Sequence, residues 1–100
     1  MTEPKFKLGQ TCMTCGVNEK CKTSTEYYEL QGFLSRHARG DWGDLCKVDK
    51  EVNDDAIANE GNPDMQGRVL SEYNSKDGTK IWIITEWDRS VTTILFPSEY

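Results

Sequence analysis

The chain has 100 residues, of which 36% are apolar and 29% are charged, and its net charge at pH 7 is −5. This length predicts one domain, residues 1–100, with a single modest core. No stretch resembles a secretory signal or a membrane span, so we expect a cytoplasmic protein and exclude a membrane-spanning one.

The first predicted element is short. Residues 6–8 alternate apolar and basic side chains before Gly9, a pattern typical of an edge strand. Lysines in such a strand discourage pairing with other chains. We therefore expect an edge strand or an extended lead-in at residues 6–8.

Four cysteines raise the question of a metal site. Cys12 and Cys15 have the spacing of half a zinc knuckle, because two thiolates separated by two residues can hold one ion. The remaining thiols, Cys21 and Cys46, each stand alone, and a reducing cytoplasm argues against disulfides. The pattern favours ordinary cysteines and no cofactor, with a zinc-stabilised interaction module as an alternative.

Residues 23–40 predict the first helix. Thr23 and Glu26 have the spacing of a capping box, and apolar residues then recur at three- and four-residue steps up to Ala38. Gly40 follows as a helix-ending residue. This is the strongest helical pattern in the chain.

His37, in the last turn of that helix, is the only histidine in the sequence. A general acid or base that works near neutral pH would most simply be this residue. With Arg89 to steady a phosphate, it would make a small metal-independent RNase or toxin. The competing interpretation is that His37 packs against the end of its helix.

Residues 40–45 combine glycine, aspartate and tryptophan in one loop. Trp42 could lie back onto the core, because a tryptophan is costly to leave in water. Alternatively, an exposed Trp42 between Asp41 and Asp44 would be a good anchor for a protein partner. Both interpretations stay open at this point.

Residues 41–64 contain eight acidic and two basic residues. A second helix is predicted from near Asp49 to Glu60, and it carries much of this acidity. Such a block repels nucleic-acid phosphates and attracts basic surfaces, so we expect no direct DNA binding and a basic, nucleic-acid-binding protein as a suitable partner. A solvated helix face that keeps the protein soluble is the competing explanation.

Three strands are predicted at residues 68–73, 79–87 and 91–96, joined by turns at residues 74–78 and 88–90. Consecutive short turns indicate an antiparallel meander. The fold class is therefore α+β, with N-terminal helices packed on a C-terminal three- to four-stranded antiparallel sheet.

The central strand is apolar on both faces. Ile81 and Ile83 point one way, Trp82 and Ile84 the other. In the last strand we group Val91 and Leu95 with the first face, and Ile94 and Phe96 with the second. One helix cannot hide both faces, so the N-terminal segment, the second helix or a second subunit in a homodimer must cover the other.

Three strings carry a family resemblance: RHARGDWGD at residues 36–44, WIITEWDRS at residues 82–90 and TTILFPSEY at residues 92–100. Together they resemble a family of small uncharacterised bacterial proteins, the plasmid-related proteins of plasmids, phages and integrated elements. The resemblance spans most of the chain and implies a mobile genetic element, with counter-defence, plasmid maintenance or toxin chemistry as its tasks. It implies no activity, cofactor or catalytic residue, and the Cys12 and Cys15 pair is not part of the family pattern.

Charge and resemblance together favour a nonenzymatic, protein-binding accessory protein of a mobile element. One form of this function is inhibition of a host defence nuclease by an acidic surface that takes the place of DNA phosphates. The expected partner-binding residues are Asp41, Trp42, Asp44, Asp49, Glu51, Asp54 and Asp55.

Overall fold

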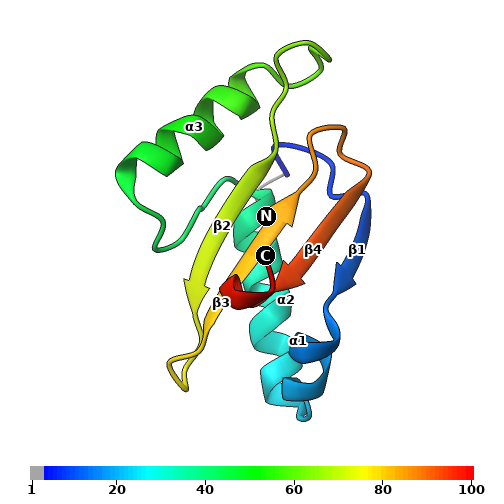
Figure 1. Ribbon diagram of the computed structural model, residues 1–100, viewed down its shortest axis with the longest axis vertical. Helices are drawn as coiled ribbons and strands as arrows, with labels where there is room; N and C mark the ends of the chain where they lie inside the picture. Colours follow the sequence, from blue (N-terminus) through cyan, green and yellow to red (C-terminus); the bar gives the residue numbers. More distant parts are fainter. Residues whose placement is uncertain (1–3) are drawn as a thin grey trace.

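The computed structural model describes residues 4–100 and has an α+β architecture, as the sequence predicts (Figure 1). Its elements in chain order are β1 (Gln10–Met13), α1 (Cys15–Lys20), α2 (Ser24–Ala38), α3 (Lys47–Ala58), β2 (Val69–Asn74), β3 (Lys80–Thr85), β4 (Val91–Leu95) and the short 3-10 turn η1 (Pro97–Glu99). None of the helices in residues 4–100 combines the length and the apolar character that a membrane crossing requires.

The four strands form one sheet in the order β1-β4-β3-β2. Strands β2, β3 and β4 form the predicted antiparallel meander. Strand β1, however, is parallel to β4, so the sheet is mixed and the prediction of a purely antiparallel sheet is wrong. The long connection through three helices and two strands makes this parallel pairing feasible, because parallel neighbours need a crossover.

The N-terminal strand also lies later in the chain than predicted. Residues 6–8 form no strand, and β1 begins at Gln10. Phe6 is buried instead, with its ring stacked 6.2 Å from that of Trp42. The lysines that we expected to protect an edge strand therefore lie outside the strand.

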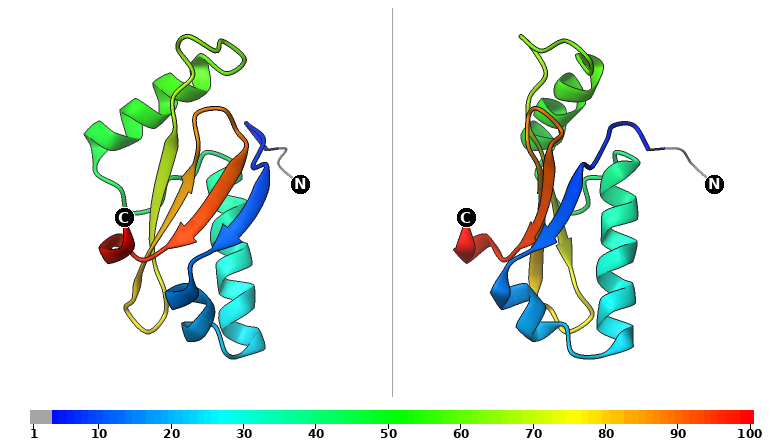
Figure 2. Two further views of the ribbon diagram at one scale, coloured as in Figure 1. Left: turned by 45° about the vertical axis from the view of Figure 1, so that its right-hand side comes forward. Right: turned by 90° about the vertical axis from the view of Figure 1, so that its right-hand side faces the viewer.

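Helix α2 crosses one face of the sheet, and η1 lies on the opposite side (Figure 2). The predicted cap is present, because the Thr23 side chain accepts a hydrogen bond from the Glu26 N–H at 3.2 Å. The core between α1, α2 and the sheet consists of Val17, Leu30, Phe33, Tyr73, Ile81, Ile83 and Ile94.

The strand register corrects our assignment of β4 side chains to the two faces. Ile83 lies opposite Ile94, and Trp82 lies opposite Leu95. Residues directly opposite each other in a sheet share a face, so Ile94 belongs to the α2 face and Leu95 to the other. A shift of one residue reverses every side chain, and the sequence did not settle the register of this hairpin.

The face away from α2 is covered within the chain by its own C-terminal end. The Tyr100 ring meets the Trp82 ring edge-on at 5.8 Å, and the Arg68 guanidinium lies 5.1 Å from the Tyr100 ring. Ile84 and Leu95 are buried, and Trp82 is half-buried. Helix α3 borders this face at its β2 edge, where Val52 and Asn53 line a pocket with Arg68 and Leu70.

Helix α3 lies beside β2, at the edge of the sheet (Figure 1). The Asn53 amide donates to the Leu70 carbonyl at 2.6 Å and accepts from the Leu70 N–H at 3.2 Å. Farther along the same edge, the Asp44 N–H donates to the Glu72 carbonyl at 2.7 Å. Gly43 permits this approach: its φ is 72°, and a Cβ there would lie 2.1 Å from the Glu72 carbonyl oxygen.

Candidate functional site

His37 lies at the centre of a buried network of hydrogen-bonded polar side chains. Its side chain has no exposed surface, and its two ring nitrogens bond to Ser71 Oγ at 2.5 Å and Thr85 Oγ1 at 2.9 Å. Thr85 Oγ1 is 2.7 Å from Thr92 Oγ1, and Thr92 donates to the Leu8 carbonyl at 2.6 Å. Helix α2 and strands β2, β3 and β4 each contribute one of these side chains.

The Leu8 carbonyl, the last acceptor in this network, fixes the direction of the hydrogen bonds. Because the Leu8 oxygen can only accept, Thr92 donates to it and must accept from Thr85. Thr85 then accepts from Nε2–H of His37. The network therefore requires a proton on Nε2, and in a neutral imidazole Nδ1 is left to accept from Ser71.

Burial favours the neutral imidazole. Desolvation, and secondarily the positive charge of Arg89, lower the pKa of His37 to about 3. An imidazole that is uncharged at neutral pH and has no exposed surface cannot contact a substrate in this conformation. The geometry gives no support to the nuclease alternative, and the histidine packs inside the fold.

Arg89, the proposed phosphate-binding partner of His37, is bound to protein groups instead. Its Nη2 lies 2.7 Å from Glu60 Oε1, and its Nε donates to both Glu60 oxygens at 3.1 and 3.2 Å. Its Nη1 donates to the carbonyls of Gly67 at 2.7 Å and Glu86 at 3.1 Å. The side chain is 5% exposed, so it holds together the β3–β4 turn and the segment after α3.

The four cysteines do not come together. Cys12 lies in β1 and Cys15 begins α1, both exposed, whereas Cys21 is half-buried and Cys46 is exposed before α3. Among residues 4–100, no three His, Cys, Asp or Glu side chains are grouped closely enough to hold a metal ion. The geometry therefore gives no support to the zinc alternative.

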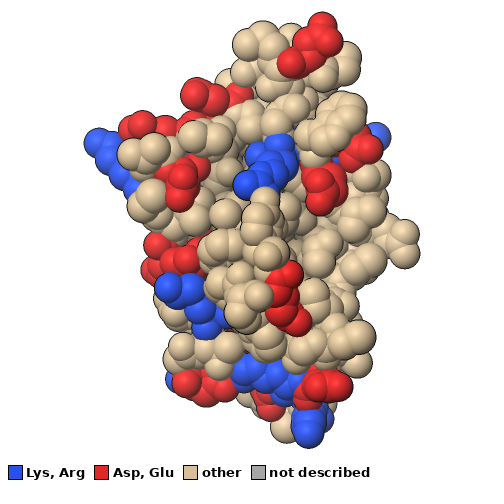
Figure 3. Space-filling view, viewed as in Figure 1, with Lys and Arg blue, Asp and Glu red and all other residues tan. Residues whose placement is uncertain are grey.

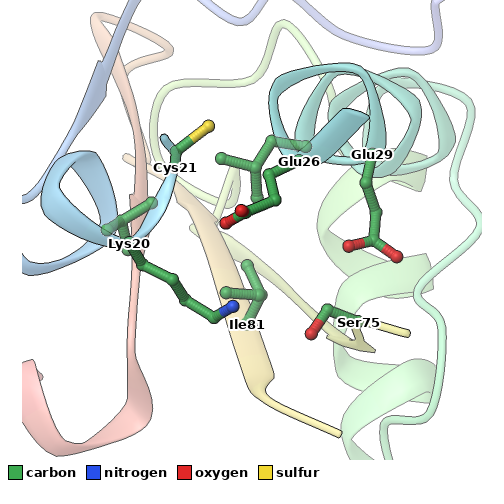
Figure 4. A pocket seen from close by; sticks show the side chains of 8 residues that line it. Lys20, Cys21, Glu26, Glu29, Ser75 and Ile81 are labelled. Atoms are coloured by element: carbon green, nitrogen blue, oxygen red, sulfur yellow. The ribbon is translucent and has the colours of Figure 1, made fainter. Parts of the chain in front are cut away.

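A small pocket lies where α1 and α2 meet the β2–β3 turn, with Ile81 in its wall (Figure 4). Its charged groups are engaged locally. Lys20 pairs with Asp77, which raises the pKa of Lys20, and Glu29 accepts the Lys76 N–H at 2.9 Å. These contacts close one end of the molecule, and of the residues considered for the zinc alternative Cys21 lines this pocket.

The predicted partner-binding residues separate into two groups. Asp41 bonds to Arg36 at 2.8 Å, which lowers the pKa of Asp41, and Asp44 accepts from the Asn74 side chain at 2.7 Å. Trp42 is 4% exposed and donates from Nε1 to Asp54 Oδ1 at 2.9 Å. Trp42 therefore packs in the core, as the structural alternative predicts, and is no exposed anchor.

The acidic residues of α3 form the second group, and they are accessible. Asp49, Glu51, Asp54 and Asp55 are all exposed. Figure 3 shows several acidic side chains over the region where Figure 1 places α3, with basic side chains among and beside them, and another acidic group on the loop beyond it. Val48 and Val52 are exposed on the same helix, at 67% and 58%.

The sequence interpretation missed Trp87. It lies in the β3–β4 turn between Glu86 and Asp88, and it is 53% exposed. The arrangement considered for Trp42, an exposed indole between two acids, is thus found at Trp87. The signal that could have revealed it is its place at the end of a predicted strand, next to a turn, where side chains leave the core.

The Trp87 turn and the segment that follows α3 lie at the same end of the molecule (Figure 1). The ion pair between Glu60 and Arg89 joins the segment after α3 to the Trp87 turn. The Gln66 side chain also donates to the Trp87 carbonyl, next to the exposed Met65. We call this surface the acidic end; its members are Asp49, Glu51, Asp54, Asp55, Asp64, Met65, Glu86, Trp87 and Asp88.

No family model, characterised protein or solved structure matches this chain. The resemblance to the plasmid-related proteins therefore stays a prediction from the sequence.

Proposed function

We propose that this chain is a nonenzymatic binding protein whose acidic end docks onto a basic protein surface. The observation that carries the proposal is the combination of exposed acids on α3 with the exposed Trp87, whose turn is bonded to the segment that follows α3. Acidic groups attract and orient a basic partner, and a tryptophan supplies the large contact area that is typical of binding hot spots.

Two features of the surroundings support this function. Within residues 4–100 the acids of α3 form no ion pairs, whereas Asp41, Glu60 and Asp77 each form one. Trp87 also leaves about half of its large apolar surface in water, a cost that contact with a partner would remove. Charge and apolar area are thus available at the same end of the fold.

The partner class follows from the charge and from the family resemblance. A surface with several exposed carboxylates can bind in a groove built for nucleic-acid phosphates. In the mobile-element setting that the resemblance implies, we propose a host defence nuclease as the partner and inhibition as the outcome.

A pull-down with the tagged protein from bacterial cells that carry restriction or CRISPR nucleases tests this function. The captured nuclease is then purified, and its cleavage of DNA is measured with and without the protein. We expect inhibition that weakens as salt is raised from about 50 to 200 mM, because exposed charges are screened.

The decisive comparison is between a variant that removes the charge at nearly unchanged side-chain size and a variant that keeps the charge. Asp49→Asn, Glu51→Gln and Asp55→Asn together remove three acids, and Asp49→Glu, Glu51→Asp and Asp55→Glu keep them. Asp54 stays unchanged in both because it bonds to Trp42. Loss of inhibition in the neutral variant alone supports the function, and equal inhibition by both variants contradicts the electrostatic basis.

A further inference from the structure

The outer edge of β1 has unpaired backbone groups. Gln10 N–H donates to the Ser90 carbonyl at 2.9 Å, and Thr14 N–H donates to the Ile94 carbonyl at 3.0 Å. Backbone groups alternate in direction along a strand, so the N–H and C=O groups of Thr11 and Met13 point away from β4. Among the described residues, no hydrogen bond from another element reaches them, and Figure 2 shows no element covering this edge.

The opposite edge of the sheet is closed by contrast. Asn53 and the loop from Trp42 to Asp44 bond to the outward backbone groups of Leu70 and Glu72 on β2. Proteins commonly protect such edges with charges, prolines, bulges or covering elements. The segment Gln10–Met13 has no charged residue and no proline, and the described elements leave it uncovered.

We propose that β1 pairs with β1 of a second copy of this chain, in antiparallel orientation. The outward groups belong to Thr11 and Met13, which are placed symmetrically about Cys12. A two-fold axis at Cys12 therefore sets Thr11 of one copy opposite Met13 of the other. In this register both N–H groups and both C=O groups of each edge find partners, and the two sheets become one.

The composition of the strand suits an identical partner. Like charges directly opposite each other would destabilise a symmetric pair, and Gln10–Met13 contains none. The half-buried Met13 would lie beside Thr11 of the second copy on the α2 face of the extended sheet. Helix α3 lies at the far edge, beyond β2, so the dimer leaves α3 accessible on each copy.

Sedimentation of the full chain over concentrations from about 1 to 500 µM tests the dimer. Thr11→Pro removes an outward N–H that β4 does not use, and Thr11→Val keeps it. We expect the wild type and Thr11→Val to dimerise, and Thr11→Pro to dimerise at least about tenfold more weakly, with the thermal transition of each variant recorded as a folding control.

Disulfide crosslinking gives a second test that does not depend on proline. In the proposed register Cys12 faces Cys12 of the second copy as a non-hydrogen-bonded pair, at a Cα separation of about 4.5 Å that a disulfide can span. Diamide takes the two thiol hydrogens and is reduced as the S–S bond forms. The variants carry one cysteine each, Cys12 or the equally exposed Cys46, with serine at the other three positions.

We expect the Cys12 variant to form a covalent dimer rapidly and the Cys46 variant to stay monomeric. A wild type that sediments as a monomer throughout, with no faster crosslinking at Cys12, would overturn the proposal. A dimer that forms equally well in Thr11→Pro and crosslinks no faster at Cys12 than at Cys46 would also overturn it, because another surface would then hold the copies together. Neither result bears on inhibition by the acidic end.

Discussion

The buried cluster around His37 and Arg89 and the acidic end both contain side chains that proteins often use for function, but their surroundings are opposite. His37 and Arg89 are buried, and their ring and guanidinium nitrogens bond to protein atoms. Asp49, Glu51 and Trp87 are exposed, and the described residues form no ion pair with these two acids. The residues most suggestive of catalysis therefore stabilise the fold here, whereas the surface residues are available for a partner.

The two tryptophans should show the largest contrast. Trp42→Ala removes a buried indole and should lower the free energy of unfolding by about 4 kcal/mol. Trp87→Ala, at an exposed turn, should change it by less than about 0.5 kcal/mol. Urea denaturation measures both, and similar losses for the two variants would remove the distinction between interior and surface.

Arg89→Ala should be the next largest change. It leaves the Glu60 carboxylate and the Gly67 and Glu86 carbonyls without their donor, so we expect a loss of about 3 kcal/mol. Arg89→Lys keeps the charge but cannot reproduce the fork of donors, and should recover little of the loss. Wild-type stability in either variant would contradict the structural role of Arg89.

The pH dependence of stability tests the neutral state of His37. The pKa of about 3 in the fold is below the usual 6.5, so the unfolded chain binds more protons between these values. Stability should therefore fall by about 1.4 kcal/mol for each pH unit as pH drops from 6 to 4.5. His37→Gln should lack this part of the slope; an unchanged slope in that variant would show that another group titrates.

Neutralising the surface acids should have the smallest effect on stability. The variant with Asp49→Asn, Glu51→Gln and Asp55→Asn should stay within about 0.5 kcal/mol of the wild type, because exposed charges contribute little. Thermal unfolding measures the change. A large loss would mean that these acids support the fold and are not free for a partner.

The antiparallel meander and α2 follow from strong local signals. Alternating apolar residues with turn residues between them predict the meander, and the Thr23 cap with its three- and four-residue periodicity predicts α2. The short α1 and the parallel strand β1 lack such signals. Six residues give too little periodicity to indicate a helix, and the pairing of β1 with β4 depends on contacts that are distant in sequence.

The candidate site was predictable in part. The acids of α3 follow from composition and helix prediction alone. The sequence does not predict that Trp42 is buried and Trp87 exposed, because both lie near glycine or aspartate in turn-like segments. Phe6 and His37, whose rings lie 6.2 and 5.8 Å from that of Trp42, are what keep Trp42 inside, and sequence spacing does not reveal these contacts.

Inhibition of the captured nuclease, titrated with three forms of the protein, tests whether the acidic end is the binding surface. These forms are the wild type, Trp87→Ala and the variant that neutralises Asp49, Glu51 and Asp55. We expect inhibition by the wild type and at least about tenfold weaker inhibition by each variant, with all three folded. Equal inhibition by all three, or none by the folded wild type, would contradict this role of the acidic end.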